Sequence, residues 1–179
     1  SGEGSGFGAL LGFDMGGTST DVSRHDGDFI YRFETRVGPA RIQAPCLAIE
    51  TVAAGGGSIC HVTDEGLSVG PRSAGAVPGP ACYGAGGPLT VTDVNLLLGR
   101  GDPSRFDIPI DMTAAASRLD ELRSRLVEHG FEDPGREAVL EGLRDIADER
   151  MAEAMRAISI REGADPRRHV LVPFGGAGG

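Results

Sequence analysis

Short stretches of alternating apolar and polar residues fill the first third of the chain, and turn residues separate them. This two-residue period is typical of half-buried β-strands. Asp26-Gly27 between two of the stretches is characteristic of a tight hairpin. The pattern predicts a strand meander over residues 9–15, 20–25 and 28–37. A second hairpin is predicted over 59–69, whereas 42–54 is apolar with a weak helical tendency.

The second half of the chain changes to the period of amphipathic helices. Helices are predicted over about 92–98, 113–129 and 134–162. Thr92 or Asp93 can cap the first, Asp133 is the predicted N-cap of the third, and Gly163 ends it. A continuous apolar stripe on the longest helix predicts that it packs on a sheet: Leu143, Ala147, Met151, Ala154 and Ile158.

An apolar segment at 169–174, predicted to be a buried strand, leads into a glycine-rich loop. A strand meander followed by helices and a further strand predicts an α/β fold with a mixed sheet. In such a fold the loops after 9–15 and after 169–174 can meet at one edge of the sheet. Residues 70–91 contain too much glycine and proline for regular structure, and long compact loops of this kind are often functional or interfacial.

The turn between the first two predicted strands carries a possible phosphate-binding pattern, FDMGGTSTDV. Glycines let backbone N–H groups approach a phosphate closely. Asp14 leaves the strand in a position to hold a hydrated divalent cation, and Thr18 can reach a terminal phosphoryl oxygen. The alternative is an ordinary Gly-Gly hairpin with solvated polar side chains.

The composition narrows the possible classes of function. The 179 residues include 17 Lys and Arg against 26 Asp and Glu, a net charge of −9 that argues against a nucleic-acid surface. An acidic chain can still bind a nucleotide when backbone amides and a metal ion meet the phosphates. The 29 glycines cluster in a few loops, which favours ligand contacts made by the backbone.

Cysteine and histidine spacing predicts neither a disulfide framework nor a zinc site. The three cysteines, Cys46, Cys60 and Cys82, form no C-x-x-C pair, which favours a reducing cytoplasmic location. No apolar run approaches the ~20 residues that span a bilayer, so no membrane partner is predicted. Residues 1–8 resemble a flexible linker or cloning scar.

Four segments resemble the hydantoinase A/5-oxoprolinase family, which also includes ATP-dependent acetone and acetophenone carboxylase subunits. They are FDMGGTSTDVS, TVAAGGGSI, GPRSAGAVPGPACYGAGGPLTVTDVNLLLGR and VPFGGAGG. The resemblance covers residues 10–179. It implies the actin-like ATPase architecture, in which ATP lies between two ribonuclease-H-like lobes. The first phosphate loop of that architecture is not in this sequence, so 9–179 is expected to be the second lobe, with 70–91 as a loop and 113–163 helical.

The resemblance also implies roles for individual residues. Gly16, Gly17 and Thr18 would contact the β- and γ-phosphates of ATP. Asp14 would hold Mg²⁺ or its water shell and help to place the nucleophile, so that Asp14 and Thr18 are the expected catalytic residues. Asp21 would fix the hairpin. The adenosine would lie against Gly175, Gly176 and Gly178.

The function implied is ATP-dependent hydrolysis of a cyclic amide, in which phosphorylation of the lactam oxygen allows water to open the ring. A subunit of an ATP-dependent ketone carboxylase and a non-catalytic, nucleotide-contacting half-lobe stay open as alternatives. The expected partners are a small cyclic amide, the missing first lobe and a hydantoinase B-type subunit or domain. The chain alone is expected to be inactive.

The 70–91 loop shows no catalytic constellation of its own. Arg72, Ser73, Cys82 and Tyr83 could contact a substrate or a partner subunit, or could simply pack against a neighbouring domain. Asp93 and Asn95 are expected to act first in a helix cap and only second at a substrate.

Overall fold

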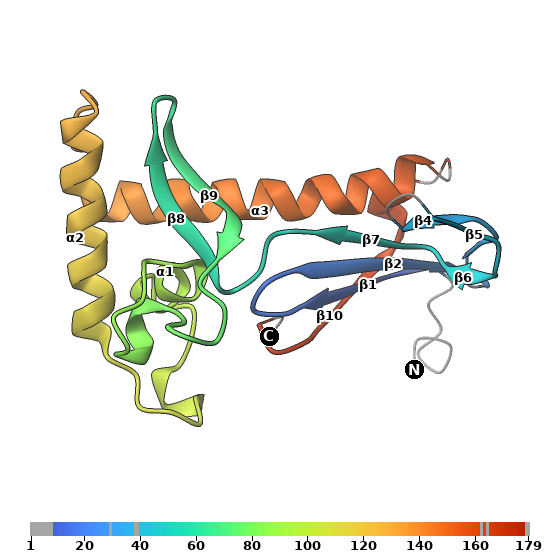
Figure 1. The fold of residues 1–179 in the computed structure, drawn as a ribbon, viewed down its shortest axis with the longest axis horizontal. Coiled ribbons are helices and arrows are strands. Elements are labelled where there is room, and N and C mark those ends of the chain that lie inside the picture. The colour runs from blue at the N-terminus through green and yellow to red at the C-terminus, as the bar shows by residue number, and fades with distance from the viewer. Residues whose placement is uncertain (1–8, 29, 38–39, 162, 164, 178–179) are drawn as a thin grey trace.

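A mixed four-stranded sheet and a long helix organise the molecule (Figure 1). The structure, a computed structural model, describes residues 9–28, 30–37, 40–161, 163 and 165–177. The sheet has the order β10-β1-β2-β7, in which β1 pairs parallel with β10 and antiparallel with β2. Its strands are β1 (Ala9–Met15), β2 (Thr20–Asp26), β7 (Ile49–Val52) and β10 (Val170–Phe174). The predicted α/β fold with a mixed sheet is confirmed.

Between β2 and β7 the chain forms short paired strands instead of the single third strand predicted over 28–37. β3 pairs with β6 and β4 pairs with β5. Their bounds are β3 (Tyr31–Arg32), β4 (Thr35–Val37), β5 (Ala40–Ile42) and β6 (Cys46–Leu47). The weak helical tendency assigned to 42–54 is wrong, because β-branched Ile49, Thr51 and Val52 pair with β2 as a strand.

The predicted second hairpin is confirmed as β8 (Ser58–Thr63) and β9 (Gly66–Ser73). Figure 1 shows this hairpin crossing α3, with α2 across the N-terminal end of α3. The helices are α1 (Val91–Leu97), α2 (Met112–Glu128) and α3 (Arg136–Arg161), and short 3₁₀ turns occur at η2 (Ala81–Tyr83), η3 (Pro103–Arg105) and η4 (Pro166–Arg168). None of the helices in the described ranges has the length and apolar content needed to cross a bilayer.

The apolar stripe of α3 is buried, as predicted. The helix lies against β2, β7 and β9, and its stripe joins a single core with residues of β1 and α2. β10 differs from its prediction. It is the edge strand of the sheet, and Leu171 and Phe174 are 45% and 50% exposed. An apolar sequence suits either position, so the sequence pattern did not distinguish an edge strand from a central one.

Two helix starts differ from the sequence prediction. The third helix begins at Arg136 because Gly135 has a φ of +89°, which is incompatible with a helical turn. Asp133 is therefore not its N-cap; its carboxylate accepts from the Gly135 N–H at 3.0 Å and pairs with Arg123. The N-cap of α1 is Thr90, and not Thr92 or Asp93.

The carboxylate of Asp93 organises the loop between β9 and α1. Asp93 is fully buried and accepts from the N–H groups of Ala81 (3.1 Å), Cys82 (2.8 Å) and Thr90 (2.7 Å). The Thr90 hydroxyl donates a further bond at 2.9 Å. Asp93 thus completes the capping box of α1 and, at the same time, satisfies backbone groups of a loop without strand partners. Asp93 therefore takes part in the cap of α1 as predicted, but from the third helical position and not as the N-cap residue.

Replacing Asp93 by Asn should destabilise the protein. The amide would direct N–H donors at backbone N–H groups, and we expect a loss of about 2–3 kcal/mol in the free energy of unfolding. Equilibrium urea denaturation measures this change. The control Asp148→Asn, on the exposed face of α3, should cost less than about 0.5 kcal/mol. Equal stability of the two variants would contradict the role given to Asp93.

Candidate functional site

The turn between β1 and β2 is fixed by local and non-local hydrogen bonds. Within the turn, the Gly16 N–H donates to the Ser19 carbonyl at 2.9 Å. At its end, the buried Thr20 hydroxyl donates to the Ala54 carbonyl at 2.6 Å. Asp14 and Asp21 lie opposite each other in the strand register that frames the turn.

Two backbone bonds join this turn to the loop before β8, and we call this pair the glycine clasp. The Gly56 N–H donates to the Gly16 carbonyl at 3.1 Å, and the Gly57 N–H donates to the Gly17 carbonyl at 2.6 Å. The C=O and N–H of a trans peptide point in opposite directions. The N–H groups of Gly17 and Thr18 therefore point away from the 55–58 loop.

Neither of these N–H groups has an acceptor within the part of the chain that the structure describes. Gly17 and Thr18 are both exposed. Two neighbouring backbone N–H groups therefore face solvent from a fixed turn, where they are available to donate to a ligand.

Glycine is required on the other side of the glycine clasp because the two backbones approach so closely. A Cβ at Gly55 would lie 2.6 Å from the Gly16 carbonyl oxygen, and one at Gly57 would lie 2.7 Å from that of Gly17. The sequence prediction assigned no role to 55–58. Its three consecutive glycines between two strands were the available indication of a close backbone approach.

The glycine loop after β10 reaches the same end of the sheet. The Ala177 N–H donates to the Met15 carbonyl at 2.8 Å, so the two strand-to-glycine junctions meet as predicted. Gly175 has a φ of +95°, and a Cβ there would overlap the Asp14 carboxylate. A Cβ at Gly176 would meet no atom within 4 Å. Gly178 lies outside the described residues.

Hydroxyl groups line the exposed side of the turn. The Ser73 hydroxyl, at the end of β9, lies 3.5 Å from both the Thr18 hydroxyl and the Gly17 carbonyl. The Thr51 hydroxyl donates to the Asp21 carboxylate at 2.6 Å, which ties β2 to β7. Asp21 thus holds the strands, in keeping with the role expected for it.

A cavity of about 940 Å³ opens beside the glycine clasp. One wall is formed by the three glycine-containing turns, and the other by α1 and the residues that follow it. Thr92 joins the two walls, because its N–H and its hydroxyl both donate to the Gly56 carbonyl, at 2.8 and 2.9 Å. Among its polar lining residues, Asn95 was predicted to act first in a helix cap and second at a substrate, whereas Arg100 had no predicted role.

Asp14 is half-buried and forms no ion pair with any other described residue. The described ranges also contain no group of three or more His, Cys, Asp or Glu side chains able to hold a metal ion. Of the two carboxylates that the described residues bring to the turn end of β1, Asp21 accepts from the Thr51 hydroxyl, whereas Asp14 forms no ion pair. A single carboxylate suits Mg²⁺, which keeps most of its water and otherwise binds substrate phosphates.

Cys82 is not a nucleophile in this arrangement. Burial raises the pKa of its thiol, and a hydrogen bond to Asp93 and the charge of that carboxylate raise it further. A thiol that stays protonated is a poor nucleophile. The contribution of this cysteine is therefore to packing under the 74–90 loop.

Comparison with known proteins assigns the chain to a family. The profile described as Hydantoinase/oxoprolinase matches residues 2–179. The chain belongs to this family. Its similarity to a 5-oxoprolinase, PfmaA from Pestalotiopsis fici, is 47% identity over 178 residues, which is 95% of this chain and 14% of that protein.

A second relative of this hydantoinase/oxoprolinase chain is the caprolactamase subunit alpha of Pseudomonas jessenii, 41% identical over 95% of the chain and 25% of the subunit. The crystal structure of the ATP-dependent caprolactamase from that organism superposes with a TM-score of 0.82 at 36% identity, covering 98% of this chain and 26% of that one. A nucleotide-free structure of acetone carboxylase also superposes with a TM-score of 0.82, at 24% identity, covering 99% of this chain and 25% of the carboxylase chain. This similarity shows the shared fold alone.

Gly175→Ala should separate the glycine loop from β1. The alanine would need a positive φ and would overlap the Asp14 carboxylate, so we expect a loss of about 2 kcal/mol or more in unfolding free energy. Gly176→Ala is the matched control, because a Cβ there meets nothing. Urea denaturation of the two variants without nucleotide measures the difference. A destabilisation of equal size in both would contradict the close approach of Gly175 to Asp14.

Proposed function

We propose that this chain is the second nucleotide-binding lobe of an ATP-dependent hydrolase of cyclic amides. The observation that carries the proposal is the glycine clasp, which directs the Gly17 and Thr18 N–H groups outward toward a ligand. The relatives support the substrate class, since 5-oxoproline and caprolactam are both cyclic amides. The carboxylase alternative has only a shared fold at 24% identity to support it.

In the proposed reaction the lactam oxygen attacks the γ-phosphorus of ATP, and the bond to the leaving ADP breaks. One water then adds to the activated ring carbon, and the C–N bond opens to leave an acyl phosphate. A second water hydrolyses this acyl phosphate, so that lactam, ATP and two waters give the amino acid, ADP and phosphate. The residues of this chain contribute by position and charge. The N–H groups of Gly17 and Thr18 and the Thr18 hydroxyl donate to phosphate oxygens.

Asp14 is the residue proposed to hold the hydrated magnesium ion, which neutralises charge on the phosphates when it is bound. Its place at the end of β1, beside the turn and without a cationic partner among the described residues, supports this role. Gly175, Gly176 and Gly178 are proposed to lie along the adenosine. The open space at Gly176 supports a close approach of the ligand there.

The rest of the nucleotide site is proposed to come from outside this sequence. The chain spans 14% of the 5-oxoprolinase and 25% of the caprolactamase subunit that it matches. We propose that a first lobe closes over the phosphates and that a hydantoinase B-type subunit or domain takes part in ring opening. The buried thiols of Cys60 and Cys82 support a reducing, cytoplasmic location.

Asp14→Asn in the full-length protein should lower ATP-dependent ring opening by about 100-fold or more, because a neutral amide is a weak magnesium ligand. Thr18→Val should cost about tenfold through the loss of one hydrogen bond to phosphate. Turnover is measured as release of amino acid and ADP from 5-oxoproline and caprolactam. Asp64→Asn, in the exposed turn between β8 and β9, is the control and should keep normal activity. Full activity of the Asp14→Asn variant would contradict the proposal that Asp14 holds the magnesium ion.

The isolated chain should bind MgATP weakly. A nucleotide clamped between two lobes loses most of its contacts when one lobe is missing. We therefore expect a dissociation constant above about 10 µM, equivalent to a binding free energy weaker than about 7 kcal/mol. Isothermal titration calorimetry of the chain with MgATP measures it, with the full-length protein as the comparison. Tighter binding by the chain alone would refute the hypothesis that it supplies only half of the nucleotide site.

A further inference from the structure

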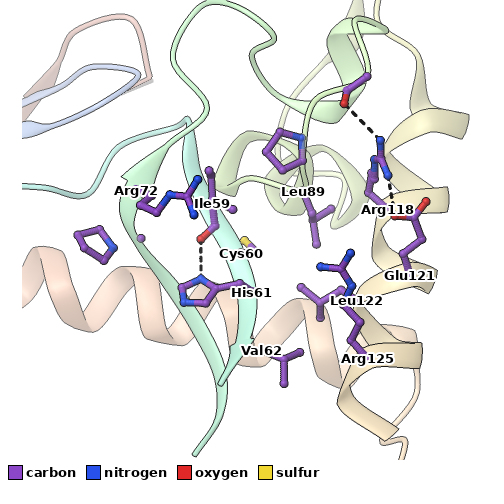
Figure 2. A pocket seen from close by; sticks show the side chains of 14 residues that line it. Ile59, Cys60, His61, Val62, Arg72, Leu89, Arg118, Glu121, Leu122 and Arg125 are labelled. Atoms are coloured by element: carbon purple, nitrogen blue, oxygen red, sulfur yellow. Dashed lines mark hydrogen bonds and ion pairs between the residues drawn. The ribbon is translucent and has the colours of Figure 1, made fainter. Parts of the chain in front are cut away.

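A second cavity lies between the β8–β9 hairpin, residues 86–89 and α2 (Figure 2). Its volume is about 540 Å³, and none of the residues that line it also lines the cavity beside the glycine clasp. The volume falls in the range of small-molecule sites in proteins. The proposed reaction assigns it no role.

The middle of this cavity is apolar. Val62 from β8, Leu89 from the loop and Leu122 from α2 supply its aliphatic surface. The buried Cys60 lies beside them, and burial followed by the charge of Asp93 raises the pKa of its thiol. The thiol therefore stays neutral, and the cavity offers no nucleophile from this position.

Two arginines, Arg72 and Arg125, flank the apolar surface of the cavity. Figure 2 shows Arg72 on the hairpin, beside Ile59, and Arg125 directed from α2 toward the hairpin, and both arginines line the cavity. Neither guanidinium has a carboxylate partner among the residues described by the structure. In a chain with a net charge of −9, two unpaired guanidiniums at one cavity make it locally suited to anions.

A third arginine builds the rim of the cavity instead of facing a ligand. Arg118 donates to the carbonyls of Gly87 at 3.0 Å and Gly86 at 3.2 Å, and it pairs with Glu121 at 2.6 Å. These bonds hold the 86–89 segment against α2. Because Glu121 is paired with Arg118, the positive charge of Arg118 compensates its negative charge at the rim of the cavity.

We propose that this cavity binds a small aliphatic dicarboxylate, with one carboxylate on Arg72 and the other on Arg125. The planar fork of a guanidinium matches a carboxylate in two parallel hydrogen bonds. Two arginines on different elements call for two separated anionic groups, and the apolar surface between them suits a short methylene chain. A compact anion such as phosphate would reach one arginine and leave that apolar surface uncovered.

The site also adjoins the predicted phosphate turn along the chain. Arg72 precedes Ser73, whose hydroxyl lies 3.5 Å from that of Thr18. An acid held by Arg72 therefore fixes the end of β9 next to the turn. The dicarboxylate site itself rests on the second cavity alone and does not depend on the proposed hydrolase activity.

Calorimetric titration of the full-length protein with glutarate at low ionic strength tests the proposal. Arg72→Gln and Arg125→Gln should each weaken glutarate binding at least tenfold. Two controls remove the same charge elsewhere: Arg167→Gln at an exposed turn, and Arg105→Gln at the cavity beside the glycine clasp. Both controls should bind glutarate within twofold of the unaltered protein. Equal losses in all four variants, or in none, would overturn the site.

Ligand variants on the unaltered protein test the same site without relying on folded mutants. Monomethyl glutarate should bind at least tenfold more weakly than glutarate, and dimethyl glutarate should not bind. Inorganic phosphate should not displace glutarate. Absence of saturable heat with glutarate up to about 10 mM, a binding free energy of less than about 3 kcal/mol, would refute the proposal. Displacement by phosphate at equal concentration would refute it as well.

Discussion

The glycine clasp is the constraint on which the site depends. Two backbone hydrogen bonds, from Gly56 to Gly16 and from Gly57 to Gly17, set the planes of two successive peptides in the turn between β1 and β2. Their carbonyls are occupied, and their N–H groups consequently face outward. A turn held only by its own bond would let these peptides rotate. The close approach that makes the bonds possible excludes any side chain at 55 and 57.

The start of α1 links the glycine clasp to the rest of the molecule. Thr92 donates twice to the Gly56 carbonyl, and one residue later Asp93 receives the N–H groups of the 74–90 loop. A glycine- and proline-rich loop cannot satisfy its own backbone through a sheet ladder, so one buried carboxylate takes over that role. The helix, the 55–58 loop and the 74–90 loop are thus positioned relative to each other by two adjacent residues.

Local periodicity predicted β1, β2, the β8–β9 hairpin and the buried face of α3, because each of these depends on neighbouring residues. Non-local effects caused the errors. The strand character of 49–52 depends on pairing with β2, and the edge position of β10 on the order of the sheet. Gly16, Gly17, Gly175 and Gly176 were predicted site residues and do lie together, whereas 55–58 was missed because backbone-to-backbone bonds leave no polar side chain in the sequence.

Charge also explains why Asp14 requires a cation in the proposed site. A carboxylate next to a triphosphate would repel it strongly at short range, and the outward N–H groups of Gly17 and Thr18 supply only partial positive charge. The net charge of −9 is spread over the chain, and charges beyond about 8 Å are screened at physiological ionic strength. The local balance at the turn therefore decides binding. It would become favourable with a divalent cation held by Asp14, so nucleotide affinity should rise with magnesium.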